Sequence, residues 1–277
     1  MSILTEPKID SHCHILDPVQ FPYLDSAAYK PAGQETGNTA YFEEVMRCYE
    51  VQHALLVGPN SGYATDNRCM LNAIASAPHK FKGIAVVPNN CGLEELETLK
   101  SQGVVGVAFN VALMGCNFYA DIEPLLRRLR QLDMWAQFQV EKDLLLDFLP
   151  MLSRVSVKTM FDHCGRPDAA GGSRQPGFQA LLALGREGRA VVKISGFVKF
   201  SNVAFPFADA RPFTELLVKD FGPANCVWAS DWPYLKAPFR LDYGPMLKIY
   251  EVDFSLSERQ SMMWDAPKKH FGFQGSP

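Results

Sequence analysis

The sequence predicts a single-domain, closed barrel of eight parallel β-strands that alternate with α-helices, a (β/α)8 TIM-like fold over residues 1–277. Short apolar runs alternate with amphipathic stretches along the whole chain, as expected for a parallel sheet covered by helices. Eight such units in about 250 residues fit a closed barrel. No Gly-x-Gly-x-x-Gly motif follows a strand, and no Pro-, Gly- or Ser-rich linker divides the chain. These absences disfavour a dinucleotide-binding sheet and a second domain.

Each expected element follows from its residue pattern. The expected strands are short and mostly apolar: Lys8–Ile15, His53–Gly58, Gly83–Val87, Val104–Asn110, Trp135–Val140, Val157–His163, Ala190–Gly196 and Cys226–Ser230. The expected helices carry apolar residues at helical spacing: Tyr41–Glu50, Leu93–Ser101, Ile122–Leu132, Asp143–Leu152, Phe178–Glu187, Phe213–Phe221 and Ser257–Phe271. Ser257, followed by Glu258 and Gln260, is expected to begin the last helix.

Three long loops each follow a predicted strand: Asp17–Ala40, Val111–Ala120 and Phe197–Ala210. Loops that follow the strands of a barrel lie at its C-terminal rim, where active sites form. Long loops at that rim commonly act as lids or specificity elements. We therefore expect these three loops to border the site.

Composition limits the class of protein. Lys and Arg total 27 and Asp and Glu total 30, which gives a net charge of −3; without a basic block, nucleic acid is not an expected partner. The first residues lack a signal-peptide pattern, and no apolar run reaches the roughly 18 residues that span a membrane. The seven cysteines are odd in number and scattered, which indicates reduced thiols. We expect a soluble cytoplasmic protein that acts on a small molecule, and its oligomeric state is left open.

Polar side chains gather at three predicted strand ends. His12 and His14 are two residues apart, so in a strand both project to the same side. His163 follows the sixth strand and Asp231 the eighth, and in a barrel these ends converge. Alone, His163 could be a core histidine bonded to the backbone and Asp231 a helix N-cap. Strand alternation predicts that Asp162 faces away from His163 and has a structural role.

Four motifs in order carry a family resemblance: Ile9-Asp10-Ser11-His12-Cys13-His14, Asp162-His163-Cys164-Gly165-Arg166-Pro167-Asp168, Val192-Lys193-Ile194-Ser195-Gly196 and Ser230-Asp231-Trp232-Pro233. Together they resemble the amidohydrolase superfamily, and within it the lactonase branch that contains 2-pyrone-4,6-dicarboxylate lactonase and the sugar-acid lactonases. The resemblance implies a hydrolase that opens a lactone, a ring ester. It implies that His12, His14 and His163 surround and polarise the substrate carbonyl and that Asp231 activates water. Such a reaction needs both an activated water and a stabilised oxyanion.

The metal ligands of binuclear relatives are missing here. Those relatives carry a carboxylated lysine or a glutamate at the fourth strand and a histidine at the fifth. Here the fourth strand ends in Phe109-Asn110 and the fifth contains Gln137 and Gln139, with Glu141 only as a reserve ligand. The resemblance to the pyrone lactonase, which works without metal, implies that this chain requires none. The alternative is one zinc or similar divalent ion held by His12, His14 and Asp231.

The arginines that grip substrate carboxylates in pyrone-dicarboxylate relatives are absent from the fourth-strand segment Gly106–Met114, which disfavours a dicarboxylate pyrone as substrate. The residues that we expect to contact the substrate are Arg166, Lys199, Gln139, Asn110 and Tyr23, with Lys30 as a further cation. Two other functions stay open at this point. One is a mononuclear zinc-dependent amidohydrolase or decarboxylase, and the other is a catalytically silent barrel that binds a small ligand.

Overall fold

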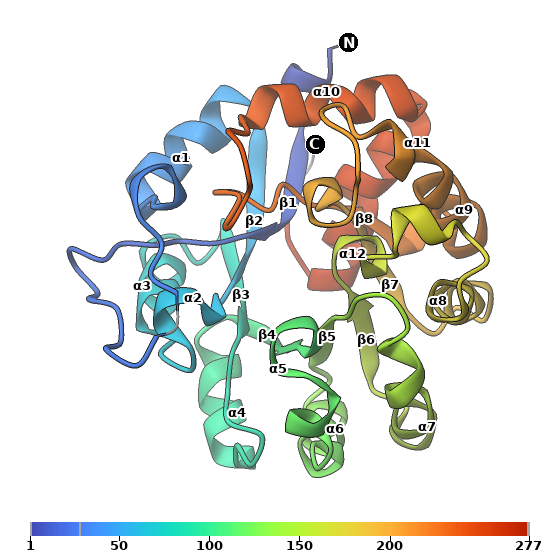
Figure 1. The fold of residues 1–277 in the computed structure, drawn as a ribbon. Helices are drawn as coiled ribbons and strands as arrows, with labels where there is room; N and C mark the ends of the chain where they lie inside the picture. The colour runs from blue at the N-terminus through green and yellow to red at the C-terminus, as the bar shows by residue number, and fades with distance from the viewer. Residues whose placement is uncertain (1, 28, 276–277) are drawn as a thin grey trace. The chain divides into compact units, whose positions relative to one another are not determined.

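The structure is a computed structural model that describes residues 2–27 and 29–275. Its eight strands form one sheet in chain order (Figure 1): β1 (Lys8–Cys13), β2 (Val51–Val57), β3 (Phe81–Ala85), β4 (Val104–Asn110), β5 (Trp135–Gln139), β6 (Lys158–Phe161), β7 (Val191–Ile194) and β8 (Cys226–Trp228). β1 pairs with β2 and β2 with β3 in parallel, and so do the successive strands from β4 to β7. Eight strands in chain order with helices between them are the (β/α)8 topology that the sequence predicts.

The helices confirm the predicted alternation and add four that the pattern missed. They are α1 (Thr39–Cys48), α2 (Asn60–Tyr63), α3 (Arg68–Ser76), α4 (Leu93–Ser101), α5 (Val111–Met114), α6 (Glu123–Gln131), α7 (Leu145–Val155), α8 (Pro176–Arg186), α9 (Arg211–Phe221), α10 (Tyr243–Asp253), α11 (Leu256–Gln260) and α12 (Ala266–Phe271). The missed helices are α2, α3, α5 and α10. Two of them have only four residues each, which is too short for a helical periodicity to show.

The start of the last predicted helix is corrected by the structure. Ser255, not Ser257, is the N-cap. The Ser255 hydroxyl accepts the Glu258 N–H at 3.4 Å, and the Glu258 carboxylate accepts the Ser255 N–H at 2.8 Å, which is a capping box. Ser257 lies inside the helix. The predicted segment is also interrupted by a π-helical turn, Ser261–Asp265, before α12 begins.

The backbone divides into two compact units. The first comprises Met1–Val86, Gln102–Val104 and Trp228–Pro277. Here the C-terminal helices return to the N-terminal strand, because α10 packs beside the first turn, Ile3–Thr5, and α12 packs beside β1 (Figure 1). Phe42 of α1 is fully buried and stacks on Trp232, with ring centroids 4.8 Å apart. The first unit therefore has an apolar core to which α1 and the segment after β8 both contribute.

The second unit comprises Val87–Ser101 and Val105–Val227. Successive helices pack side by side, α6 with α7, α7 with α8, and α8 with α9 (Figure 1). Stacked rings on neighbouring strands fill its core, because Phe138 of β5 lies 5.0 Å from Phe109 of β4 and 6.1 Å from Phe161 of β6 between centroids. The expectation that residues 1–277 form a single domain stays a prediction.

Two findings bear on the expected environment of the chain. None of the helices within the described residues has the length and apolar character that a membrane span requires. All seven cysteines lie in the described part of the chain, and none of them forms a disulfide.

Candidate active site

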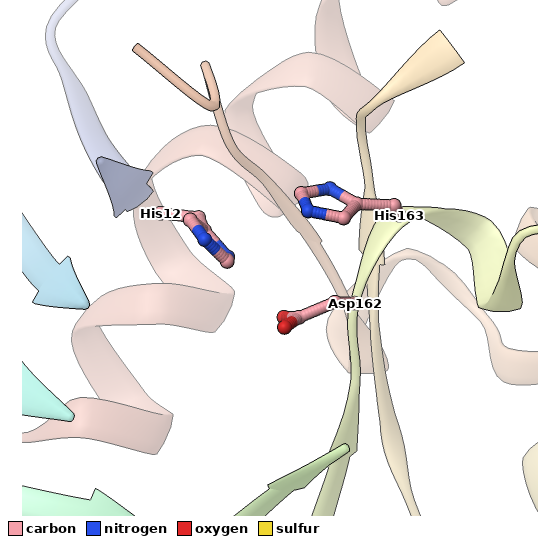
Figure 2. Close-up of side chains that lie close together, drawn as sticks. All are labelled: His12, Asp162 and His163. Carbon is pink, nitrogen blue, oxygen red and sulfur yellow. The ribbon is translucent and has the colours of Figure 1, made fainter. Parts of the chain in front are cut away.

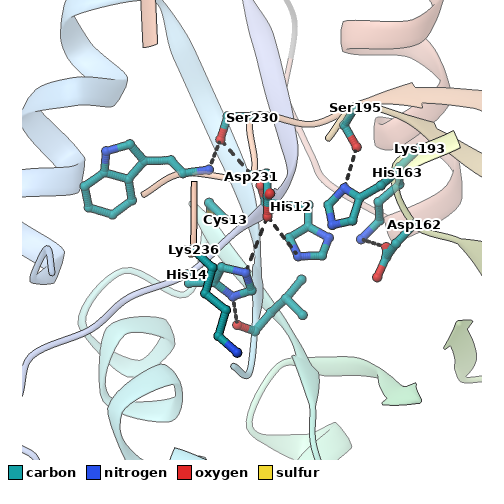
Figure 3. Close-up of polar contacts among 12 residues, drawn as sticks. His12, Cys13, His14, Asp162, His163, Lys193, Ser195, Ser230, Asp231 and Lys236 are labelled. Carbon is teal, nitrogen blue, oxygen red and sulfur yellow. Dashed lines mark hydrogen bonds and ion pairs between the residues drawn. The ribbon is translucent and has the colours of Figure 1, made fainter. Parts of the chain in front are cut away.

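The first unit brings His12, His14 and Asp231 together, as predicted. The Nε2 atom of His12 lies 3.9 Å from Oδ1 of Asp231, and Nε2 of His14 lies 3.7 Å from the same oxygen. The two imidazole rings meet edge to face, with centroids 4.9 Å apart. All three residues are buried, with exposed fractions of 2%, 8% and 4%. Figure 3 shows both rings directed at one carboxylate.

Backbone hydrogen bonds between β1 and the segment after β8 create this arrangement. The Asp231 N–H donates to the His12 carbonyl at 2.9 Å, and the His14 N–H donates to the Trp232 carbonyl at 2.8 Å. Asp231 has φ = 61°, a left-handed conformation that Asp tolerates better than most residues. The N-cap alternative for Asp231 does not hold, because the next helix begins only at Tyr243.

The hydrogen bond of the His14 ring determines what its second nitrogen can do. Nδ1 lies 2.8 Å from the carbonyl oxygen of Val57, at the end of β2. A carbonyl oxygen only accepts, so Nδ1 carries the proton. Nε2, which faces Asp231, is then an acceptor when the ring is neutral and a donor only when the ring is protonated. His14 can therefore polarise a carbonyl only as imidazolium.

The three side chains also suit one divalent cation. The ligand atoms of His12, His14 and Asp231 all lie within 4.8 Å of one another, whereas the ligands of a tetrahedral zinc site are about 3.4 Å apart. Small side-chain movements would close the difference. The bond from Nδ1 of His14 to a backbone carbonyl is the usual outer support of a metal-binding histidine. The donor set therefore fits one such ion.

In the second unit, Asp162 and His163 lie on the segment that follows β6 (Figure 2). Nδ1 of His163 lies 3.1 Å from the Ser195 hydroxyl, so this ring bonds a side chain as well as packing in the core. The prediction that Asp162 faces away from His163 is wrong, because ligand atoms of the two lie within 4.8 Å. Strand alternation does not apply here, since β6 ends at Phe161 and His163 has φ = 51°.

The structural role predicted for Asp162 agrees with a buried polar network. Lys193 Nζ lies 3.0 Å from Asp162 Oδ1 and donates to Oε1 of Gln137 at 2.7 Å. The Gln137 amide in turn donates to Asp162 Oδ2 at 2.9 Å. The Lys193 side chain is fully buried. Each of the three side chains thus bonds both of the others, and a glutamine in β5 serves this network.

Two of the other predicted substrate contacts, Arg166 and Asn110, have protein partners in the structure. Arg166 pairs with Glu141 at 2.9 Å, so the reserve metal ligand is held in an ion pair. The Asn110 side chain caps α5 by accepting the Leu113 N–H at 3.1 Å. The remaining residues are Gln139 at the end of β5, Lys199 in the turn Phe197–Lys199, Tyr23 against Tyr63 with centroids 5.1 Å apart, and Lys30 with its Nζ 3.9 Å from Asp25. Their substrate-binding roles stay predictions.

Lys236, which is drawn with the site residues in Figure 3, was not predicted from the sequence. Its Nζ lies 4.7 Å from the centroid of the Tyr29 ring, a cation–π contact. Its backbone N–H donates to the Glu35 carboxylate, which also accepts the Tyr29 hydroxyl. The sequence feature that could have identified Lys236 is its position, five residues after Asp231.

Comparisons with known proteins place this geometry in context. The model of the amidohydrolase family matches residues 9–273. The 4-sulfomuconolactone hydrolase of Hydrogenophaga intermedia is 26% identical over 95% of this chain and 88% of its own length. The 2-pyrone-4,6-dicarboxylate hydrolase of Comamonas testosteroni is 24% identical over 82% of this chain and 76% of its own. A crystal structure of a probable 2-pyrone-4,6-dicarboxylic acid hydrolase from Acinetobacter baumannii, with citric acid bound, is 28% identical with a TM-score of 0.83, covering 97% of this chain and all of that one.

Proposed function

Because the chain belongs to the amidohydrolase family, we propose that it is a lactonase that opens the ring ester of a small organic acid. The observation that carries the proposal is the Asp231 carboxylate, buried and faced by two imidazole nitrogens at 3.7 and 3.9 Å. Relatives that match most of the chain support the reaction, since two of them are named as hydrolases of a muconolactone and of a pyrone.

In the proposed reaction Asp231 is the general base. Its distances to His12 and His14 exceed a direct hydrogen bond of about 3.2 Å, and we propose that a water molecule binds to the three groups. Asp231 takes one proton from that water as its oxygen attacks the lactone carbonyl carbon. The developing oxyanion accepts a hydrogen bond from His12, and from His14 when that ring is protonated. When the ring C–O bond breaks, the leaving alkoxide recovers the proton from Asp231, which yields an open-chain hydroxy acid.

His163 is proposed as a third imidazole donor to the carbonyl. The support is the position of its segment after the sixth strand, since the C-terminal ends of barrel strands carry the catalytic groups. Within its own unit, the Ser195 hydroxyl lies 3.1 Å from Nδ1 of the ring and orients the imidazole. The role of His163 stays a prediction.

We propose that Lys236 binds the acid group of the substrate. Both named relatives act on lactones with acidic substituents, a sulfo group in one and two carboxylates in the other. Within the described residues Lys236 forms no ion pair with a carboxylate, and its ammonium lies against the Tyr29 ring instead. A lysine in that position can bind a carboxylate or sulfonate as a point charge.

We propose that the reaction requires no metal ion. The alternative is a reaction that depends on one bound metal ion. In that alternative, one zinc or similar ion would be held by His12, His14 and Asp231. The hydrogen bond from Nδ1 of His14 to the Val57 carbonyl favours such an ion, because it leaves the Nε2 lone pair facing the Asp231 carboxylate. Such an ion would lower the pKa of its bound water and polarise the carbonyl. Two ions are not expected, because Asn110 caps α5 and Gln137 serves the Lys193 network.

A panel of lactones tests the proposed function. The panel contains 4-sulfomuconolactone, 2-pyrone-4,6-dicarboxylate and uncharged γ- and δ-lactones, and acid release is followed for wild type and Asp231→Asn. Hydrolysis of at least one lactone that depends on Asp231 supports the proposal. Calorimetric binding of a lactone without turnover over hours would favour the catalytically silent barrel instead. We further propose that the enzyme is cytoplasmic, since thiols stay reduced in that compartment and its seven cysteines are free. A role in catabolism stays a prediction.

A further inference from the structure

Asp10 is a buried carboxylate for which the proposed reaction has no use. It lies within β1 and is fully buried. Its Oδ1 accepts the Ser230 N–H at 2.9 Å and the His12 N–H at 3.2 Å, and its Oδ2 accepts the Tyr243 hydroxyl at 2.8 Å. The carboxylate thus joins β1 to the segment after β8 and to the start of α10.

These bonds hold the backbone on both sides of the site. Ser230 directly precedes Asp231, and the Asp231 N–H donates to the carbonyl of His12. Asp10 therefore holds the N–H of His12 and the N–H of Ser230, the residue just before Asp231. Asp231 needs such support, since its φ of 61° lies in a region that non-glycine residues seldom occupy.

The charge of Asp10 has no cationic partner. Within residues 2–27 and 29–275, no lysine or arginine forms an ion pair with it. Burial raises the pKa of the Asp10 carboxyl, and the hydrogen bonds from Ser230, Tyr243 and His12 act in the opposite direction. Burial of a carboxyl group is costly unless it is hydrogen-bonded. Two of its hydrogen bonds come from N–H groups of the backbone that carries His12 and Asp231, which points to a role at the site beyond core packing.

We propose that Asp10 is a positioning residue, which holds the Asp231 carboxylate in register with His12 and does not touch the substrate. This inference rests on the proposed function. It predicts that the shape and hydrogen bonds of the group matter more than its charge. Asparagine can keep all three contacts, because its amide oxygen accepts both N–H groups and its amide nitrogen can donate to the Tyr243 oxygen. Leucine has a similar size and keeps none of them.

The test compares Asp10→Asn with Asp10→Leu on the best lactone of the panel. We expect Asp10→Asn to retain most of kcat and Asp10→Leu to lose about 100-fold in kcat with KM nearly unchanged, as for a misplacement of about 1 Å. Equal kcat values for the two variants, or a loss confined to KM, would overturn the proposal. If Asp10→Leu does not fold, Tyr243→Phe takes its place. This variant removes one donor to Asp10 and keeps both backbone hydrogen bonds, so we expect kcat to fall by much less than about 100-fold. A Tyr243→Phe loss as large as 100-fold would count against the backbone bonds as the essential contacts.

A second readout separates this inference from the proposed function. If wild type hydrolyses no lactone, the proposed function fails, and crystal structures of wild type and Asp10→Leu still test the positioning role. Displacement of Asp231 from its left-handed conformation in Asp10→Leu, with the rest of β1 unchanged, supports the role. An unmoved Asp231 overturns it.

Discussion

The Nε2 atom of His14 faces Oδ1 of Asp231 at 3.7 Å while Nδ1 of the same ring is held by the Val57 carbonyl. A neutral His14 and an ionised Asp231 would both present acceptors to the space between them. Two acceptors are stable at this distance when a proton donor or a cation lies between them. A water molecule, a ring proton or a metal ion can each meet that need, and the predictions below separate these cases.

Replacing Asp231 by asparagine removes the proposed base and keeps the shape of the side chain. We expect kcat for the best lactone to fall by about 10²–10⁴-fold, the usual contribution of a positioned base. A pH-stat that measures acid release gives the rates. Asp25→Asn is the matched control, because Asp25 is fully exposed, and it should behave like wild type. Undiminished hydrolysis by Asp231→Asn would rule out its role as the base.

Replacing His12 by alanine should harm turnover more than folding. Loss of one oxyanion donor is expected to lower kcat by about 10²–10³-fold, while the melting temperature stays near that of wild type because the ring lies at the end of a strand. Calorimetry and kinetics on the same sample measure both. His53→Ala is the control, since His53 lies on β2 and its Nδ1 bonds the His79 carbonyl. A large fall in melting temperature with little kinetic change would show that His12 is structural.

The histidine pair and Asp231 could be predicted from the sequence because local rules apply to them. His12 and His14 are two residues apart, so they project to the same side of a strand. A barrel brings the ends of its first and last strands together. The same rule failed for Asp162, since β6 ends at Phe161, two residues before the predicted end at His163, and the chain takes left-handed conformations from His163 to Arg166.

The role inferred for Asp10 could not be predicted from the sequence. Its partners Ser230 and Tyr243 are 220 and 233 residues away, and no periodic pattern links a carboxylate to a backbone N–H at that separation. The Lys193 network has the same character, because Gln137 lies 56 residues before its lysine. Polar contacts in the core depend on tertiary packing, whereas strands and helices follow local periodicity.

Replacing Lys236 by methionine should weaken binding of acidic lactones. We expect KM for 4-sulfomuconolactone or 2-pyrone-4,6-dicarboxylate to rise about tenfold, which corresponds to about 1.4 kcal/mol. An uncharged δ-lactone should show no change. Lys80→Met is the control, because Lys80 is partly exposed and its Nζ pairs with the Glu43 carboxylate at 2.9 Å. An equal rise in KM for charged and uncharged lactones would show that Lys236 does not recognise the acid group.

Replacing Lys193 by methionine should destabilise the fold, because the buried Asp162 carboxylate loses the ammonium group that lies 3.0 Å from its Oδ1. We expect a loss of about 3–5 kcal/mol in the free energy of unfolding, measured by urea denaturation. Lys158→Met, which breaks the exposed pair with Asp133, should cost less than about 1 kcal/mol. Adding Asp162→Asn to the Lys193 variant should recover part of the loss. A stability equal to that of wild type would show that the network contributes nothing.

The final prediction concerns metal. Zinc should bind with a stoichiometry of one per chain, and His14→Ala should abolish that binding, because His12, His14 and Asp231 provide the three ligands within 4.8 Å of one another. If Asp231 acts as base on a water that no ion holds, removal of metal by a chelator should leave the lactonase rate nearly intact. Metal analysis, zinc titration and the pH-stat assay on the same preparation measure both quantities. His53→Ala again serves as the control and should bind zinc like wild type. Activity that disappears with the metal and returns in proportion to added zinc would overturn the metal-free reaction and establish the mononuclear one, and two zinc ions per chain would contradict both.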